Sequence, residues 1–88
     1  MARALVENRL AACVNVVPGV ESIYRWQGEV ETAQEALLIM KTTAARFGEL
    51  RHRILELHRY AVPEIVAIPI VEGSASYLSW VAGEVGKG

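Results

Sequence analysis

Three side chains of this chain belong to types that commonly bind metal ions. Cys13, the only cysteine, would as a thiolate suit a soft metal such as Cu(I), or nucleophilic chemistry. His58 offers an imidazole, a common ligand for Cu(II) and Zn(II), and Glu64 offers a carboxylate further along the chain. Each also has an ordinary structural interpretation. A free cysteine is often a small buried hydrophobe, a histidine can end a helix, and a carboxylate can join an ion pair.

The spacing of these residues matches no established signature. His52 and His58 fall on one predicted helix about 600° apart around its axis, so their rings point to different sides. The sequence holds no zinc signature, no G-x-S-x-G elbow and no Gly-rich phosphate loop. A metal site would have to be completed by other strands or other subunits, and the sequence favours a binding protein over an enzyme.

A second group of side chains is suited to lining a ligand-binding cleft between subunits. Lys41 ends an apolar run and is a candidate ion-pair partner for Glu64. Tyr24 and Trp26 lie where we expect a hairpin tip, and Tyr60 lies in the loop before Glu64. Because aromatic residues are enriched in protein interfaces, subunit packing is the alternative role for the tip residues.

Length, composition and charge limit the classes of function. The 88 residues predict one domain, 1–88, that buries roughly 60–65% of its unfolded surface, and 52% of them are hydrophobic, so we expect subunit contacts to add stability. The net charge is -1 with basic residues scattered singly, which argues against binding to nucleic acid or to a membrane surface. No apolar run approaches the ~20 residues of a membrane span. A single cysteine indicates a reducing compartment, and we expect the cytoplasm.

The first half of the chain is typical of a helix followed by a hairpin. Residues 2–12 are rich in helix formers and predict the end of a helix. The β-forming residues of Val14–Trp26 predict a strand in which Pro18-Gly19 indicates a bulge. Gln27-Gly28 is typical of a turn, and we expect the second strand over Glu35–Thr42.

The second half predicts a helix, a strand and a last helix. The helix spans Ala44–His58 behind an N-cap at Thr43, and its apolar stripe is Phe47, Leu50, Ile54 and Leu57. Glu64–Val71 predicts a strand, and Ser74 can cap a helix that runs to about Val85. The order of elements is most of a ferredoxin-like βαββαβ unit of the α+β class with an extra C-terminal helix, and the N-terminal strand is absent from this sequence.

Several motifs in register resemble the CutA family of divalent-cation tolerance proteins. They run across nearly the whole chain and are Leu10-Ala11-Ala12-Cys13-Val14-Asn15, Val17-Pro18-Gly19, Ser22-Ile23-Tyr24-Arg25-Trp26 with Gly28, Lys41-Thr42-Thr43, Val62-Pro63-Glu64-Ile65, and Tyr77-Leu78 with Trp80.

The resemblance implies a ferredoxin-like subunit in a tight homotrimer whose long hairpins reach across to neighbouring subunits. It also implies association with Cu(II) and similar divalent cations, and a contribution to metal tolerance. In such a trimer His58, Glu64 and Cys13 would contact the metal, and the cleft residues named above would shape the site. The alternative is a sensor or adaptor similar to the trimeric PII-like regulators, which would bind a small ligand in its inter-subunit clefts and signal to a partner protein.

Two features depart from the family pattern. Typical members begin roughly 20 residues earlier, with a strand that lies centrally in the sheet between Glu35–Thr42 and Glu64–Val71. Three explanations stay open: a shortened or wrongly started sequence, a segment of a neighbour that fills the gap, or flanking strands that close up and pair in parallel. The family's usual His-Pro-Tyr is here His58-Arg59-Tyr60, which places a positive charge beside a candidate ligand.

Overall fold

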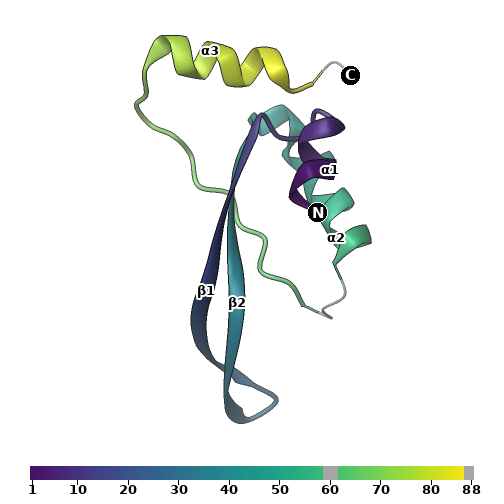
Figure 1. Ribbon diagram of the computed structural model, residues 1–88, viewed down its shortest axis with the longest axis vertical. Coiled ribbons are helices and arrows are strands. Elements are labelled where there is room, and N and C mark those ends of the chain that lie inside the picture. Colours follow the sequence, from purple (N-terminus) through teal and green to yellow (C-terminus); the bar gives the residue numbers. More distant parts are fainter. Residues whose placement is uncertain (59–61, 87–88) are drawn as a thin grey trace.

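The computed structural model describes residues 1–58 and 62–86 and shows an α+β arrangement built around one long hairpin (Figure 1). The elements in order are α1 (Ala2–Glu7), β1 (Cys13–Trp26), β2 (Glu29–Lys41), the 3₁₀ turn η1 (Ala44–Arg46), α2 (Phe47–Leu57) and α3 (Ala75–Glu84). Helices α1 and α2 lie beside one half of the hairpin, α3 lies across its upper end, and the other half projects away from the helices.

The hairpin follows the local chemistry of its turn and bulge. Gln27 and Gly28 both have positive φ, 50° and 85°, as a two-residue type I′ turn requires, so the predicted turn is confirmed. The strand register shifts between Val17 and Val20, which confirms the predicted bulge. Strand β2 begins at Glu29, before the predicted Glu35, because a two-residue turn places Glu29 directly opposite the last residue of β1 and backbone pairing needs no apolar side chain.

Helix α1 ends at Glu7, several residues before the predicted end at residue 12. Arg9 takes the left-handed conformation, with φ 58°, and the Leu10 N–H donates to the carbonyl of Leu5 at 3.0 Å. The Arg9 N–H donates to the carbonyl of Val6, also at 3.0 Å, which completes a Schellman motif. The predicted helix was too long because the left-handed position after its C-terminus, which is usually glycine, is occupied by Arg9, a residue type that does not indicate a helix end.

The core forms where α1 and α2 meet. Its buried side chains are Leu5, Leu10, Leu50 and Ile54, and the partly buried Met40, Leu57 and Ile65 pack against them. The predicted apolar stripe of the second helix is thereby confirmed at its two central positions. Thr43 and Ser74 stand at the N-cap positions of η1 and α3, as predicted, although neither side chain makes a capping hydrogen bond.

The prediction of a strand over Glu64–Val71 is wrong for this chain. Among the described residues the sheet has two strands, β1 and β2, and this segment runs as coil toward α3. Ile65 packs on the core, whereas Ile68 is 83% exposed. A strand requires a neighbouring strand for its backbone groups, and none of the described segments pairs with this one. The explanation in which it closes up and pairs with β2 is therefore also wrong.

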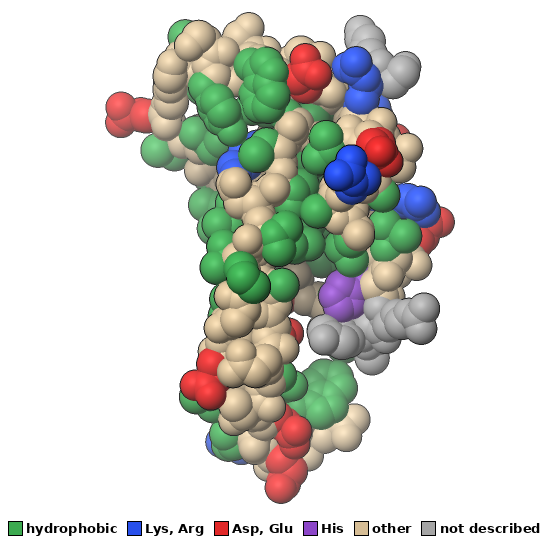
Figure 2. Space-filling model, in the orientation of Figure 1, with side chains coloured by type: hydrophobic (Ala, Val, Ile, Leu, Met, Phe, Trp, Pro, Cys, Tyr) green, Lys and Arg blue, Asp and Glu red, His purple; other side chains and the backbone are tan. Residues whose placement is uncertain are grey.

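The fold leaves much apolar surface in contact with solvent. The chain exposes 6693 Å², against about 5,100 Å² expected for a compact monomer of its mass, and its radius of gyration is 14.7 Å, against about 12 Å. Hydrophobic side chains cover much of the hairpin and the segment leading to α3 (Figure 2). The largest exposed aliphatic fractions belong to Ile23, Val30, Val62, Val66, Ile68 and Val71. The excess area, roughly 1,500 Å², is about twice the ~800 Å² that each partner buries in a standard protein interface.

No helix in the described part of the chain is long and apolar enough to cross a membrane.

Candidate functional site

Cys13 and Lys41 occupy one rung of the hairpin, where β1 begins and β2 ends. The Lys41 Nζ lies 3.7 Å from the Cys13 Sγ, and both side chains are partly buried. Because the ammonium would repel a metal cation at the sulfur, Lys41 has to turn away before Cys13 can act as a ligand. The structure thus joins a candidate metal ligand and a candidate cleft residue that are 28 positions apart in sequence.

Two hydrogen bonds fix the backbone next to the Cys13–Lys41 pair. The Ala12 N–H donates to the carbonyl of Lys41 at 2.8 Å, and the Thr42 hydroxyl donates to the carbonyl of Leu10 at 2.7 Å. Both bonds tie the loop between α1 and β1 to the end of β2. The Cys13–Lys41 pair therefore sits on a fixed backbone next to the helical core.

The two other candidate metal ligands come from different elements than Cys13, the end of α2 and the coil that leads to α3. His58 is the C-terminal cap of α2, partly buried, and its N–H donates to the carbonyl of Ile54 at 2.8 Å, so the predicted place at a helix end is confirmed. Glu64 is exposed and forms no ion pair with Lys41, whose ammonium faces Cys13 instead. In residues 1–58 and 62–86 no three His, Cys, Asp or Glu side chains gather as a metal-binding group.

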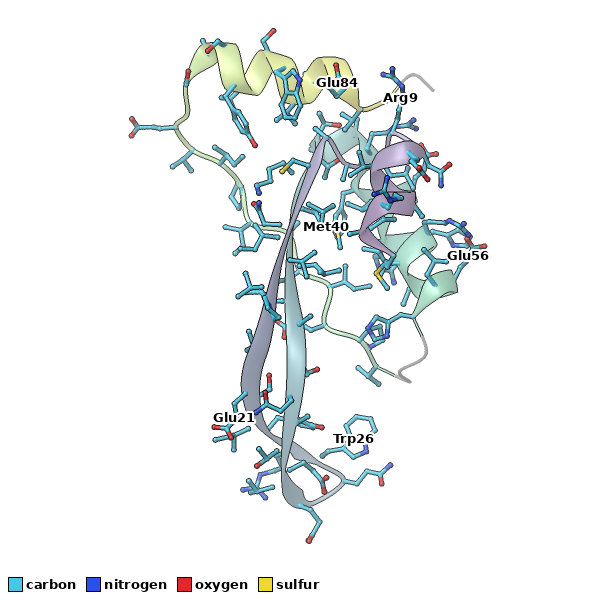
Figure 3. All side chains as sticks on the ribbon, viewed as in Figure 1. Arg9, Glu21, Trp26, Met40, Glu56 and Glu84 are labelled. Carbon is cyan, nitrogen blue, oxygen red and sulfur yellow. The ribbon has the colours of Figure 1, made fainter. Side chains whose placement is uncertain are left out.

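The candidate aromatic residues lie at the far end of the hairpin. Tyr24 stands opposite Glu31 and Trp26 opposite Glu29, ten and twelve positions from Lys41 along β2, roughly 33–40 Å of extended strand. Figure 3 shows Trp26 at the lower end of the hairpin and Met40 beside the helices. Tyr60 lies outside the described residues. One copy of the chain therefore does not bring Tyr24 and Trp26 to the Cys13–Lys41 pair.

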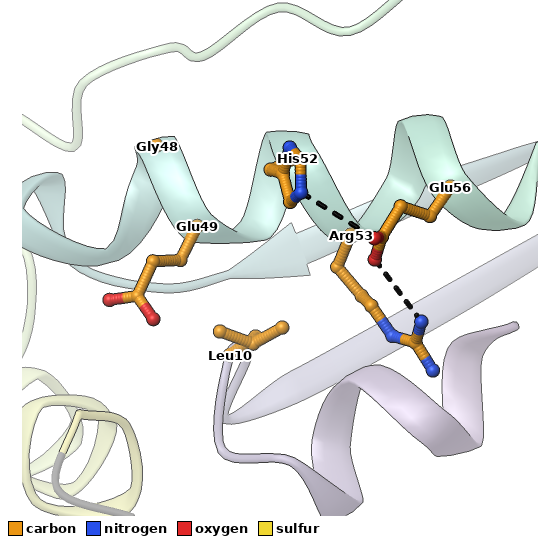
Figure 4. A pocket seen from close by; sticks show the side chains of 6 residues that line it. All are labelled: Leu10, Gly48, Glu49, His52, Arg53 and Glu56. Atoms are coloured by element: carbon orange, nitrogen blue, oxygen red, sulfur yellow. Dashed lines mark hydrogen bonds and ion pairs between the residues drawn. The ribbon is translucent and has the colours of Figure 1, made fainter.

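The structure also shows a hollow that the sequence interpretation missed. It lies between α2 and the loop before β1, measures about 340 Å³, and is lined by Leu10, Gly48, Glu49, His52, Arg53 and Glu56 (Figure 4). The Glu56 carboxylate pairs with His52 Nε2 at 3.5 Å and Arg53 Nη1 at 3.2 Å. The i,i+3 and i,i+4 spacing was the available signal. These side chains are 39–74% exposed, so their pairing adds little stability, and the Glu56 carboxylate is already engaged by its two neighbours.

A second hollow, of about 560 Å³, lies between the start of α2 and the end of α3. Arg46 lines it, donating from Nη1 to Glu49 Oε1 and from Nη2 to the carbonyl of Gly86, each at 2.5 Å. The Arg46 Nε is buried without a partner in the described part of the chain. The guanidinium thus fastens the C-terminal end of α3 to α2 rather than presenting an open binding group.

The chain is similar to proteins of one family over nearly its whole length. The family model described as CutA1 divalent ion tolerance protein matches residues 1–84. The divalent-cation tolerance protein CutA of Thermus thermophilus is 59% identical over 86 residues, which are 98% of this chain and 84% of that protein.

Solved structures agree with this relationship. The divalent cation tolerance protein (Cut A1) from Thermus thermophilus superposes with a TM-score of 0.94 at 60% identity, over 97% of this chain and 82% of that one. A structure named PII-like protein CutA from Nostoc sp. PCC 7120 gives 0.91 at 42% identity, over 97% of this chain and 83% of that one. The ferredoxin-like α+β class predicted from the sequence is confirmed by these likenesses, and the chain belongs to the CutA1 divalent ion tolerance protein family.

Proposed function

We infer that this chain is a single-domain subunit of a homotrimer that binds divalent metal cations, Cu(II) foremost, and contributes to divalent-cation tolerance. The observation that carries the inference is the family match over residues 1–84. It is a proposal of binding rather than catalysis, since the matching family is described by tolerance of divalent ions and not by a reaction.

The geometry of one copy supports a site completed between copies. Cys13, His58 and Glu64 do not form a metal-binding group within the described residues of a single chain. The exposed apolar side chains of the hairpin and of residues 62–71 supply the surface on which copies would pack. Packing of copies would bring the His58 end of α2 near the hairpin tip of a neighbour. Tyr24 and Trp26 of that tip would then shape the cleft together with Tyr60 and Lys41 from a different copy.

Titration calorimetry with CuCl₂, on protein whose mass in solution is measured by sedimentation velocity, tests both parts of the proposal. His58→Ala is expected to weaken Cu(II) binding at least about tenfold, because loss of an imidazole ligand removes a coordinate bond. His52→Ala is the matched control, since His52 lies on the same helix with 74% of its side chain exposed.

The results of these measurements distinguish the role of His58, the binding of metal and the trimer from one another. Equal affinities for the His58→Ala and His52→Ala variants would remove His58 from the site. Wild-type protein that binds no Cu(II) would overturn the metal role, and a stable monomer at micromolar concentration would overturn the trimer.

A second function, a sensor or adaptor of the PII-like kind, is favoured by one observation: the Nostoc structure with a TM-score of 0.91 is itself named PII-like. Such a protein would bind a small ligand between subunits and then engage a partner protein. A pull-down from cell extract that recovers a partner only when the ligand is present would support this function, and identical recovery without ligand would contradict it.

We place the protein in the cytoplasm, because its single cysteine, Cys13, is free. Cell fractionation followed by immunoblotting tests this location.

A further inference from the structure

Cys13 is the first residue of β1 and lies at the end of the ladder that β1 forms with β2. On one side Val14 continues the ladder opposite Met40, and on the other side the chain leaves the sheet toward α1. Backbone hydrogen bonds at the end of an element open at a lower free energy than those in its interior. The position of the Cys13 sulfur therefore depends on how the residues just before β1 are held.

Residues 8–12, which we call the α1–β1 loop, are tied to α1 by backbone hydrogen bonds. The N–H groups of Leu10 and Ala11 both donate to the carbonyl of Leu5, at 3.0 and 3.3 Å. The side chains of Leu10 and Ala11 are buried, with 8% and 1% of these residues exposed. The helix side of the loop is thus fixed without any polar side chain.

On the strand side the loop is tied to the end of β2, and here a side chain takes part. The Ala12 N–H donates to the carbonyl of Lys41, and the Thr42 hydroxyl donates to the carbonyl of Leu10 at 2.7 Å. The second bond joins residues that are 32 positions apart and is partly buried. Because water has limited access there, the Leu10 carbonyl that loses this donor would favour another arrangement of the loop.

We propose that Thr42 is a positioning residue for Cys13: its hydroxyl holds the α1–β1 loop on the end of β2 and so fixes where the Cys13 sulfur meets a metal cation. The inference rests on the proposed binding of divalent cations and adds a residue that does not touch the metal. Groups that orient a metal ligand commonly change metal affinity about 10–100-fold when they are lost. Thr42 acts through the backbone of the loop, so we expect the lower end of this range or slightly less.

The experiment measures the affinity for Cd(II) by competition with a chelator. Cd(II) is a soft divalent cation that binds thiolates without oxidising them, and its thiolate complexes have a charge-transfer absorption in the ultraviolet that reports the bond to sulfur. Thr42→Val removes the hydroxyl and keeps the shape of the side chain, whereas Thr42→Ser keeps the hydroxyl. The matched control is Thr43→Val, because Thr43 is the next residue, is also partly buried and makes no capping hydrogen bond.

Thr42→Val is expected to weaken Cd(II) binding at least about fivefold and to lower the charge-transfer absorption per bound ion. Thr42→Ser and Thr43→Val are expected to stay within about twofold of wild type. In a Cys13→Ala background Thr42→Val is expected to change the remaining affinity by less than about twofold, because the effect passes through the sulfur.

A readout without metal accompanies the titrations. Amide hydrogen exchange at Ala12, whose N–H donates to the Lys41 carbonyl, is expected to accelerate at least about fivefold in Thr42→Val. Circular dichroism checks that each variant folds. If Thr42→Val does not fold, Thr42→Ala, compared with Thr43→Ala, is measured by the same criteria.

Each alternative result identifies which step is wrong. Unchanged Cd(II) affinity in a folded Thr42→Val protein would overturn the positioning role and leave the proposed metal binding standing. An equal loss of affinity in the Cys13→Ala background would also overturn it, since Thr42 would then act on the fold in general. Wild-type protein that binds Cd(II) without the charge-transfer absorption would exclude Cys13 as a ligand and overturn this inference alone, whereas wild-type protein that binds neither Cd(II) nor Cu(II) would overturn the proposed function as well.

Discussion

The ammonium nitrogen of Lys41 lies 3.7 Å from the sulfur of Cys13, across the rung that closes the base of the hairpin. This contact places the positive charge of Lys41 beside the sulfur of Cys13, the only cysteine in the chain and its candidate soft ligand. The balance between the two side chains therefore bears directly on the proposed binding of metal cations.

Replacing Lys41 by Met should raise the affinity of the protein for copper about three- to tenfold, if Cys13 is a ligand. The reason is that a partly exposed ammonium repels a neighbouring cation by on the order of 1 kcal/mol. Competition with a copper chelator measures the affinity. Lys41→Arg keeps the charge and is the control, and a Lys41→Met protein with unchanged affinity would show that the metal binds away from Cys13.

Replacing Arg9 by Gly should stabilise the fold by about 0.5–1 kcal/mol, because Arg9 holds a positive φ of 58° that glycine adopts without a steric penalty. Urea unfolding measures the change in the free energy of unfolding. Arg9→Ala also removes the contact of the guanidinium with the Glu84 carbonyl but keeps a Cβ atom. If the glycine and alanine variants are equally stable, the backbone at this position is not left-handed in solution.

The same substitution, Gly→Ala, should have opposite effects at two positions. Gly28 has a φ of 85° in the hairpin turn, so Ala there should cost about 1 kcal/mol of stability. Gly48 is the second residue of α2 and has nothing within 4 Å of an added Cβ, so Ala there should add roughly 0.5 kcal/mol or less. Thermal unfolding of the two variants in parallel checks the signs. A loss at Gly48 would mean that a neighbouring copy occupies this surface.

Replacing Arg46 by Met should loosen the C-terminal end of α3. The guanidinium donates to the carbonyl of Gly86, next to the buried Val85, and Met cannot make this bond. We expect amide hydrogen exchange at residues 81–86 to accelerate at least about fivefold, which is about 1 kcal/mol of local stability. Arg53→Met, which removes only a surface pair with Glu56, should leave exchange there unchanged.

In the hairpin, some features can be predicted from neighbouring residues alone and others cannot. Pro18-Gly19 predicts a bulge and Gln27-Gly28 predicts a turn, since both depend on the backbone chemistry of neighbouring residues. The number of residues by which the bulge shifts the register does not follow from these local signals. The register in the structure shifts by one residue there, which sets Cys13 opposite Lys41, whereas an unbroken ladder from the turn would set it opposite Thr42. The Cys13–Lys41 contact therefore depends on the size of this register shift, which the residue types do not predict.

The sequence alone determined the hairpin with its bulge and turn, the apolar stripe of α2 and the family. Each of these depends on residues that are close in sequence or on motifs at a fixed spacing. The tertiary structure decided that Glu64–Val71, although apolar and rich in β-formers, is not a strand, and that His58, Glu64 and Cys13 do not form a metal-binding group within the described part of one chain. The physical reason is the same in both cases: a strand and a metal site each need groups from elsewhere in space, and only the packing of the whole chain shows whether those groups arrive.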